Sequence, residues 1–302
     1  MLSKQADEVA SLYRNWVAAT AANPEMPLDE WRDMIEGWAV LTAEPDSVDY
    51  IHTDAGGVPA LWAIPKGCAE DRVLLCLHGG GFVTGSIYTH RKLFGHLAKA
   101  IGARALSPNY RRPPEHVHPA QLEDSVAAYA WLLDQGINSN HIALAADSSG
   151  GGLAISTLLR AREQGLPMPA AAMLLSPWVD MEVSGETMLS HAETDALFTK
   201  PMVEGLASMF VGVGGNRRDP LASPFYGDLV GLPPVYIQVG DQETLLDDSR
   251  RLAERAQNAG VDTRLDIFAE QQHTFQMTAG RAPEADEAIH RLADWARPRL
   301  GL

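Results

Sequence analysis

The stretch ALAADSSGGG at residues 143–152 predicts how the centre of the chain is folded. Small apolar residues lead into Ser148, and a glycine-rich segment that becomes apolar follows it. This succession is typical of a buried strand that passes through a sharp turn into a helix. The turn pattern G-x-S-x-G is met at Ser148 and Gly150, while Ala146 stands where the first glycine is expected. We therefore expect the Ser148 hydroxyl at the tip of a strand-to-helix turn.

Apolar runs and amphipathic segments alternate along most of the chain. The apolar runs predict eight strands, at residues 48–54, 58–65, 72–77, 103–110, 142–146, 170–176, 235–239 and 263–268. The first two flank Gly56 and Gly57, which is a hairpin signal. Helical periodicity separates most of the others, for example at residues 91–101. The alternation predicts an α/β fold with a mostly parallel eight-stranded sheet flanked by helices.

Two segments lie outside this alternation. Residues 1–45 contain two amphipathic helices separated near Pro24. Residues 180–232 contain one predicted helix, at residues 200–210, within a loop rich in glycine and proline. Each segment either docks on the body of the protein or forms part of a lid over a pocket.

The 302-residue chain is acidic, with a formal net charge of −15. A negative surface repels phosphate backbones and anionic lipid head groups, so we expect neither a nucleic-acid partner nor a membrane partner. Residues 1–8 lack the apolar core of a secretory signal, and no uncharged apolar run reaches the length of a membrane span. We expect a cytoplasmic location.

Side chains that bind metals form no recognisable pattern. Cys68 and Cys76 do not suggest a disulfide or zinc framework. His116 and His118 form an H-x-H pair without a nearby third ligand. We expect no metal and no cofactor.

A serine hydroxyl is a poor nucleophile unless a base takes its proton. His273 is the best-placed candidate for that base, because it falls between the last predicted strand and the last predicted helix. His290 lies within that helix and is expected to face away from any strand end. Other histidines lack a motif context, among them His52, His90, His96, His141 and His191.

A carboxylate that orients the base is expected after the strand at residues 235–239. Asp241 and Glu243 both lie on the loop that follows, and the residues alone leave the choice open. The order serine, acid, histidine along the chain is the order found in α/β-hydrolases.

Backbone donors for a developing oxyanion are expected at two places. Gly80 and Gly81 follow the strand at residues 72–77, and glycine lets a backbone approach closely. The N–H of Ser149 lies at the start of a helix, where the dipole favours negative charge. These three groups are candidates for an oxyanion hole.

Together these motifs resemble the hormone-sensitive lipase family of α/β-hydrolases, in its bacterial esterase branch. The matching segments are HGGGF at 78–82, YRRPPE at 110–115, PA at 119–120, DSSGG at 147–151, SPW at 176–178, ETLLD at 243–247 and HTF at 273–275. The resemblance implies Ser148 as nucleophile and His273 as base. It implies Glu243 rather than Asp241 as the acid.

The resemblance also implies a domain organisation and supporting residues. A helical cap would comprise residues 1–45 and the insertion 180–232, and the catalytic domain would comprise residues 46–179 and 233–302. The oxyanion hole would be formed by Gly80, Gly81 and Ser149, and the supporting carboxylates would be Asp147 and Asp247. The chain departs from the family pattern at Ala146, at Pro113 and at Ser149, which replaces a frequent alanine although only its backbone N–H is needed.

The resulting hypothesis is a serine hydrolase that cleaves carboxylic esters, with short acyl chains, through an acyl-enzyme. The candidates for an apolar pocket wall, each with ordinary core as the alternative, are Trp38, Phe82, Trp178, Leu206 and Phe210. Lactone hydrolysis is an alternative, since the chain is also similar to bacterial ε-lactone hydrolases, and amide hydrolysis stays open. A ligand-binding receptor is disfavoured because the triad is complete. The resemblance further suggests a homodimer through the last strand or helix.

Overall fold

The computed structural model describes residues 2–302 and contains the predicted eight-stranded sheet. The strands follow the spatial order β1-β2-β4-β3-β5-β6-β7-β8. β1 and β2 form the antiparallel hairpin, β2 pairs antiparallel with β4, and all later neighbours are parallel. Their bounds are β1 Val48–Asp54, β2 Pro59–Pro65, β3 Val73–Leu77, β4 Arg104–Pro108, β5 Ile142–Asp147, β6 Ala171–Leu175, β7 Val235–Gly240 and β8 Thr263–Phe268. The predicted mostly parallel sheet is confirmed.

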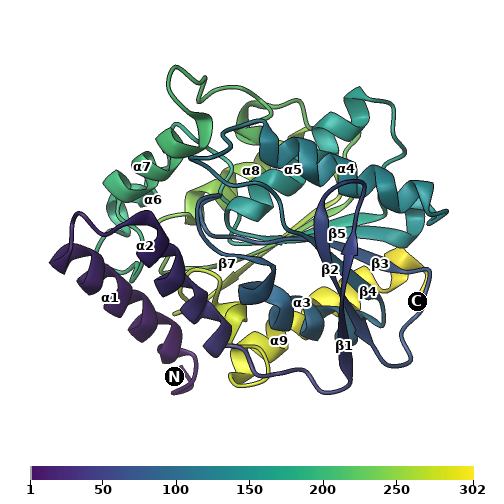
Figure 1. Ribbon diagram of the computed structural model, residues 1–302, viewed down its shortest axis with the longest axis horizontal. Helices are drawn as coiled ribbons and strands as arrows, with labels where there is room; N and C mark the ends of the chain where they lie inside the picture. The colour runs from purple at the N-terminus through teal and green to yellow at the C-terminus, as the bar shows by residue number, and fades with distance from the viewer. Residues whose placement is uncertain (1) are drawn as a thin grey trace.

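Helices cover both faces of the sheet (Figure 1). α3 (Ile87–Ile101) and α9 (Pro283–Ala296) pack together on one face. The other face carries α4 (Ala120–Asp134), α5 (Ser149–Glu163) and α8 (Leu246–Asn258). The sheet is therefore the middle of three layers, and its central strands are shielded from water on both sides.

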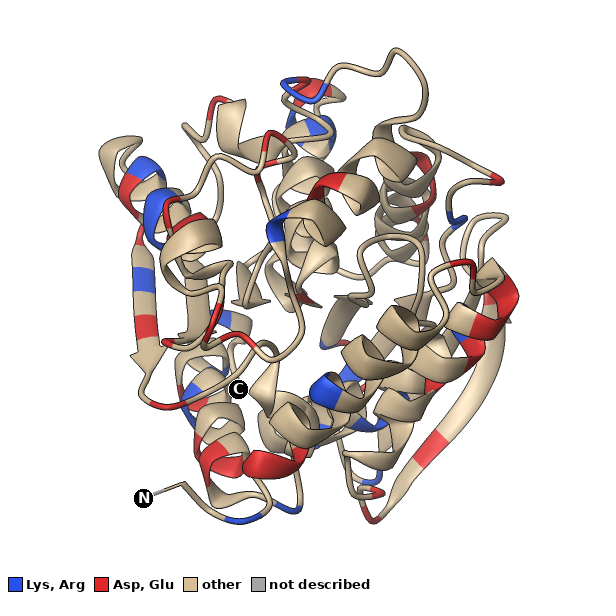
Figure 2. Ribbon diagram, turned by 90° about the vertical axis from the view of Figure 1, so that its left-hand side faces the viewer, with Lys and Arg blue, Asp and Glu red and all other residues tan. Residues whose placement is uncertain are grey.

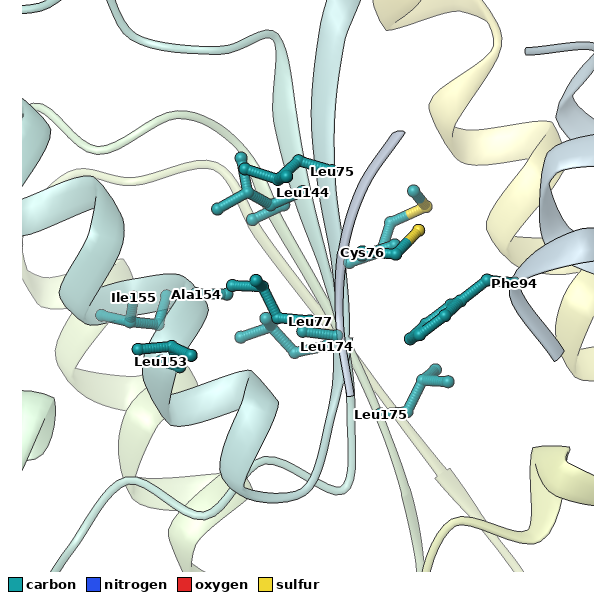
Figure 3. Close-up of a cluster of buried hydrophobic side chains, with 14 of the residues drawn as sticks. Leu75, Cys76, Leu77, Phe94, Leu144, Leu153, Ala154, Ile155, Leu174 and Leu175 are labelled. Carbon is teal, nitrogen blue, oxygen red and sulfur yellow. The ribbon is translucent and has the colours of Figure 1, made fainter. Parts of the chain in front are cut away.

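The central strands are apolar throughout because both of their faces are buried. Figure 3 shows Leu75 and Leu77 on the side of α5, near Ile155, while Cys76 points to the opposite side, towards Phe94. All five side chains are buried. Cys76 is thus a small core residue.

The helix predicted at residues 91–101 begins earlier, at Ile87. Ser86 caps it, because its hydroxyl accepts a hydrogen bond from the N–H of Thr89 at 3.2 Å. Thr89 Oγ1 in turn accepts from the N–H of Ser86 at 2.9 Å, which completes a capping box. His90 therefore belongs to the first turn of α3.

The two segments outside the sheet-and-helix body lie together at one end of the molecule, on the left of Figure 1. The N-terminal segment contains α1 (Asp7–Ala22) and α2 (Leu28–Ile35), and the insertion contains α6 (Thr187–Ser190) and α7 (Lys200–Val211). Both segments contribute side chains to one cavity, described below.

Figure 2 views the molecule from the end that carries α1 and α2. Acidic and basic positions are interspersed over this face rather than gathered in one place. Within residues 2–302, no helix combines the length and the apolar character needed to cross a membrane.

Candidate active site

Ser148 lies at the turn between β5 and α5, where the sequence places it. Its backbone angles, φ 52° and ψ −123°, are rarely adopted by a residue with a side chain and indicate local strain. Gly150 must be glycine, because a Cβ there would lie 2.1 Å from the carbonyl oxygen of Leu77. Ala146 is accommodated as an ordinary buried strand residue that pairs with Leu77.

Ser148, His273 and Glu243 form a continuous chain of hydrogen bonds. His273 Nε2 lies 2.9 Å from Ser148 Oγ, and His273 Nδ1 lies 2.8 Å from Glu243 Oε2. The second oxygen of Glu243 accepts hydrogen bonds from Ser176 Oγ and from the Gly240 N–H, both at 2.6 Å. A carboxylate on Nδ1 holds a histidine in the tautomer whose Nε2 accepts a proton from serine.

The structure separates the two acids between which the residues alone could not decide. Asp241 Oδ1 accepts hydrogen bonds from Gln242 Nε2 and from the N–H of Glu270, both at 2.7 Å. Glu243 is the acid bonded to His273.

The loop that carries His273 is held by the N-terminal segment. Tyr13 of α1 lies within hydrogen-bond distance of the His273 carbonyl oxygen, at 3.0 Å, and of Thr274 Oγ1, at 2.9 Å. Trp38 Nε1 donates to the Tyr13 hydroxyl at 3.0 Å. Tyr13 lies in the first of the two amphipathic helices predicted at residues 1–45, and no local pattern in the sequence links its hydroxyl to His273.

Residues 78–82 form the predicted oxyanion loop. Two of its N–H groups are oriented because the carbonyl groups of the same two peptides are held by hydrogen bonds. His78 Nδ1 donates to the Gly79 carbonyl oxygen at 2.7 Å. Burial lowers the pKa of His78 to about 3, so the ring is neutral at physiological pH. Because the N–H and C=O of a trans peptide point in opposite directions, this bond turns the Gly80 N–H away from His78.

The next peptide is fixed in the same way. The Gly80 carbonyl oxygen accepts hydrogen bonds from the N–H groups of Val83 and Thr84, at 3.1 and 2.9 Å, and from Thr84 Oγ1 at 2.8 Å. The Gly81 N–H therefore points the other way. Among residues 2–302, neither the Gly80 nor the Gly81 N–H has a hydrogen-bond acceptor. Both are available to a ligand.

Asp147, directly before Ser148, binds the start of this loop and a residue that sequence reasoning set aside. Its Oδ1 accepts from the Gly79 N–H at 2.9 Å, and its Oδ2 accepts from His90 Nε2 at 3.1 Å. Both side chains are fully buried. The histidine lies 57 residues away in the chain, and no local pattern links it to Ser148.

A small apolar cavity lies against the oxyanion loop. Its free volume is about 20 Å³, roughly the space of one water molecule. Gly80 and Gly81 line it on one side. Its other lining residues, drawn mostly from the N-terminal segment and the insertion, include Trp16, Trp31, Ile35, Trp38, Leu197, Phe198, Met202 and Leu206. The ring of Phe198 also meets the His273 imidazole edge to face at 4.8 Å.

The five predicted wall residues divide into two groups. Trp38 and Leu206 line the cavity. Phe82, Phe210 and Trp178 do not line it, because they pack against one another beside it: Phe82 stacks on Phe210 and lies 6.0 Å from Trp178 between ring centroids. These three are buried core at the boundary between the body and the insertion.

Within residues 2–302, no three His, Cys, Asp or Glu side chains are grouped so that they could hold a metal ion. His118 of the H-x-H pair instead lies 3.3 Å from an oxygen of Asp219 in the insertion. Burial lowers the pKa of His118 despite this carboxylate.

Comparisons with known proteins agree with this geometry. A family described as the alpha/beta hydrolase fold matches residues 74–277. The chain is 39% identical over 246 residues to an acetyl-hydrolase of Streptomyces hygroscopicus, with 82% of each chain covered. It is 33% identical over 225 residues to an esterase of Acinetobacter venetianus, with 74% of each covered. A solved esterase structure from the bacterial hormone-sensitive lipase family is 42% identical, with a TM-score of 0.95 and 100% of both chains covered.

Fold, site geometry and relatives thus define an α/β-hydrolase that cleaves carboxylic esters. Within that class, the chain belongs to the bacterial hormone-sensitive lipase family, as its motifs suggested. Its substrates are small-molecule esters.

Proposed function

We propose that Ser148 attacks the ester carbonyl carbon, with His273 as general base and Glu243 as the acid that orients it. The proton of Ser148 Oγ passes to His273 Nε2 as the new carbon–oxygen bond forms. Glu243 stabilises the resulting imidazolium from the Nδ1 side. The observation that carries this proposal is the hydrogen-bonded chain from Ser148 Oγ through the His273 ring to Glu243.

The oxyanion that forms is met by the N–H groups of Gly80, Gly81 and Ser149. The imidazolium then donates its proton to the leaving alkoxy oxygen, and the carbon–oxygen bond to that group breaks. In the second half of the reaction His273 takes a proton from water as the water oxygen attacks the acyl carbon. The bond between that carbon and Ser148 Oγ then breaks, His273 returns the proton to Ser148 Oγ, and the carboxylic acid is released. The same donors stabilise both tetrahedral intermediates.

The experiment that tests this mechanism replaces the nucleophile. Ser148→Ala should lower turnover of p-nitrophenyl acetate by about 10⁴-fold or more, since removing a triad serine leaves only binding and oxyanion stabilisation. Ser125→Ala is a matched control, because this buried serine bonds Thr157 at 2.7 Å between α4 and α5. Undiminished turnover by Ser148→Ala would end the proposal. Tight ligand binding without any turnover by the wild type would favour a receptor.

Short acyl chains fit the site best. The cavity beside Gly80 and Gly81 is small and bordered by bulky apolar side chains such as Trp38 and Leu206. A relative 39% identical to this chain is named an acetyl-hydrolase, which supports the same substrate class. Turnover of p-nitrophenyl acetate and butyrate should exceed turnover of the octanoate. Faster turnover of the long-chain ester would contradict this assignment.

A second candidate activity is the hydrolysis of cyclic esters on the same triad. Ring opening needs the same attack and the same donors, and differs in that the leaving hydroxyl stays joined to the acyl group. A direct comparison of kcat/KM for a small lactone and for ethyl acetate would rank the two.

We propose that residues 1–45 and 180–232 form a cap on a catalytic domain of residues 46–179 and 233–302. The two cap segments meet at the cavity, where α1, α2 and α7 all contribute lining residues.

We also propose a homodimer that uses the edge strand β8, where Ile267 is 43% exposed. Light scattering would measure its mass.

A further inference from the structure

We infer that the side-chain hydroxyl of Ser149 positions the oxyanion loop, in addition to the backbone N–H that this residue offers to substrate. The inference rests on the proposed function of Ser148. It concerns the one site residue at which this chain carries a hydroxyl where its family frequently has alanine. Ser149 would be a positioning residue, because its hydroxyl acts through the loop and not on the substrate.

The contact that carries the inference joins α5 to the oxyanion loop. Ser149 Oγ accepts a hydrogen bond from the backbone N–H of Phe82 at 3.1 Å. Ser149 is fully buried and Phe82 is 1% exposed, so water does not compete freely for this N–H. A buried backbone N–H requires an acceptor. The Ser149 hydroxyl provides it from the residue directly after the nucleophile.

The loop needs hydrogen bonds from other segments, because its two glycines can adopt several backbone conformations. Gly80 has φ 114° and Gly81 has φ 60°, which glycine adopts readily and could also leave readily. Phe82 has φ 65°, which is strained for a residue with a side chain. The Phe82 N–H belongs to the peptide that follows Gly81. A hydrogen bond to this N–H limits rotation at the Gly81 Cα and so keeps the Gly81 N–H directed into the oxyanion hole.

The two residues that flank Ser148 thus hold the two ends of the donor segment. Asp147 Oδ1 binds the Gly79 N–H at 2.9 Å, and Ser149 Oγ binds the Phe82 N–H at 3.1 Å. The donors Gly80 and Gly81 lie between these two points. This arrangement sets the distance between the nucleophile and the oxyanion donors through side chains of the same turn that carries the nucleophile.

The test is Ser149→Ala, which retains the backbone N–H and removes only the hydroxyl. We expect kcat for p-nitrophenyl acetate to fall about 10-fold with KM changed less than 2-fold, because a displaced donor weakens the transition state more than the substrate complex. The affinity for 1,1,1-trifluoro-2-butanone, whose adduct with Ser148 places an oxyanion in the hole, should fall by a similar factor. Ser149→Cys carries sulfur, which is a weak acceptor. Its kcat and its affinity for the ketone should lie between those of the wild type and those of Ser149→Ala.

The control is Ser125→Ala, which removes a buried hydroxyl from a contact between α4 and α5 and should leave kcat unchanged. Wild-type kcat and wild-type ketone affinity in Ser149→Ala would overturn the inference. If Ser149→Ala does not fold, a Ser149→Cys variant with wild-type kcat would overturn it equally. These outcomes differ from failure of the proposed function, which would appear as retained turnover by Ser148→Ala.

Discussion

The rings of Phe82 and Phe210 lie face to face, with centroids 3.7 Å apart and an interplanar angle of 7°. Phe82 ends the oxyanion loop, and Phe210 belongs to α7 of the insertion. The contact therefore joins a helix of the proposed cap to the residue next to the oxyanion donors. Leu206, one turn earlier on α7, lies close to the same loop, because a Cβ on Gly81 would be 2.8 Å from both Leu206 methyl carbons.

Phe210→Ala should reduce both stability and turnover. Loss of a buried phenyl ring typically lowers the free energy of unfolding by about 3–5 kcal/mol. We expect kcat to fall as well, because Phe82 loses the surface that supports its strained backbone. Chemical denaturation and p-nitrophenyl acetate kinetics measure the two effects. Phe225→Ala, in the same insertion, removes a ring that lies against the Arg251 and Arg255 guanidinium groups and should affect stability alone. Equal kcat in Phe210→Ala and the wild type would show that α7 does not support the loop.

Glu243→Gln should lower kcat by about 10³–10⁴-fold, since a neutral amide neither orients His273 nor stabilises its protonated form. Asp241→Asn is the matched control on the same loop. Its carboxylate bonds Gln242 and Glu270 and not the histidine, so its kcat should stay within a few-fold of the wild type. Steady-state kinetics of the two variants rank the acids, and the reverse ranking would move the assignment to Asp241.

His90 should support the site through Asp147. In His90→Leu, the buried Asp147 carboxylate loses one of its two hydrogen-bond partners, which typically lowers stability by about 1–3 kcal/mol. The Gly79 end of the oxyanion loop then becomes less well held, so kcat should fall as well. In His90→Gln, the side-chain amide can still donate a hydrogen bond to Asp147. Stability and kcat should then both be close to those of the wild type. Melting temperature and kcat are the measurements. If the leucine and glutamine variants behave alike, the hydrogen bond to Asp147 has no role.

Stability should decrease as the pH falls below about 6.5, in part because of His78. Its pKa is about 3 in the folded protein, against about 6.5 for a free histidine. Between these values the unfolded chain binds a proton that the folded protein does not, so acid favours unfolding. This one group should lower the free energy of unfolding by about 2 kcal/mol between pH 7.5 and pH 5.0.

The matched variant is His78→Phe, which retains a ring to stack on Tyr110, 4.3 Å away between centroids, but cannot titrate. Its free energy of unfolding should decrease less between the same two pH values. Urea denaturation at each pH gives the difference. A pH dependence equal to that of the wild type would mean that His78 has the same pKa in the folded protein as in the unfolded chain.

The sequence alone was sufficient for the parts of the protein that depend on neighbours in the chain. Apolar runs and helical periodicity predicted the eight strands, because burial of both sheet faces leaves a local pattern. The small residues around Ser148 predicted the turn, since only a small residue such as Gly150 fits against the Leu77 carbonyl. Ser148, His273 and an acid at either Asp241 or Glu243 could be nominated because each follows a strand, and parallel strands end at the same edge of the sheet. The choice of Glu243 came from the family resemblance.

Contacts between distant segments were decided by the tertiary structure. Tyr13 reaches the His273 loop across 260 residues, and His90 reaches Asp147 across 57. Phe82, Phe210 and Trp178 proved to pack on one another rather than around the cavity. The Ser149 hydroxyl, at a position where the family frequently has alanine, accepts a hydrogen bond from the Phe82 N–H. Such contacts leave no periodic trace along the chain, because they depend on how whole layers pack and on which buried polar groups then need partners.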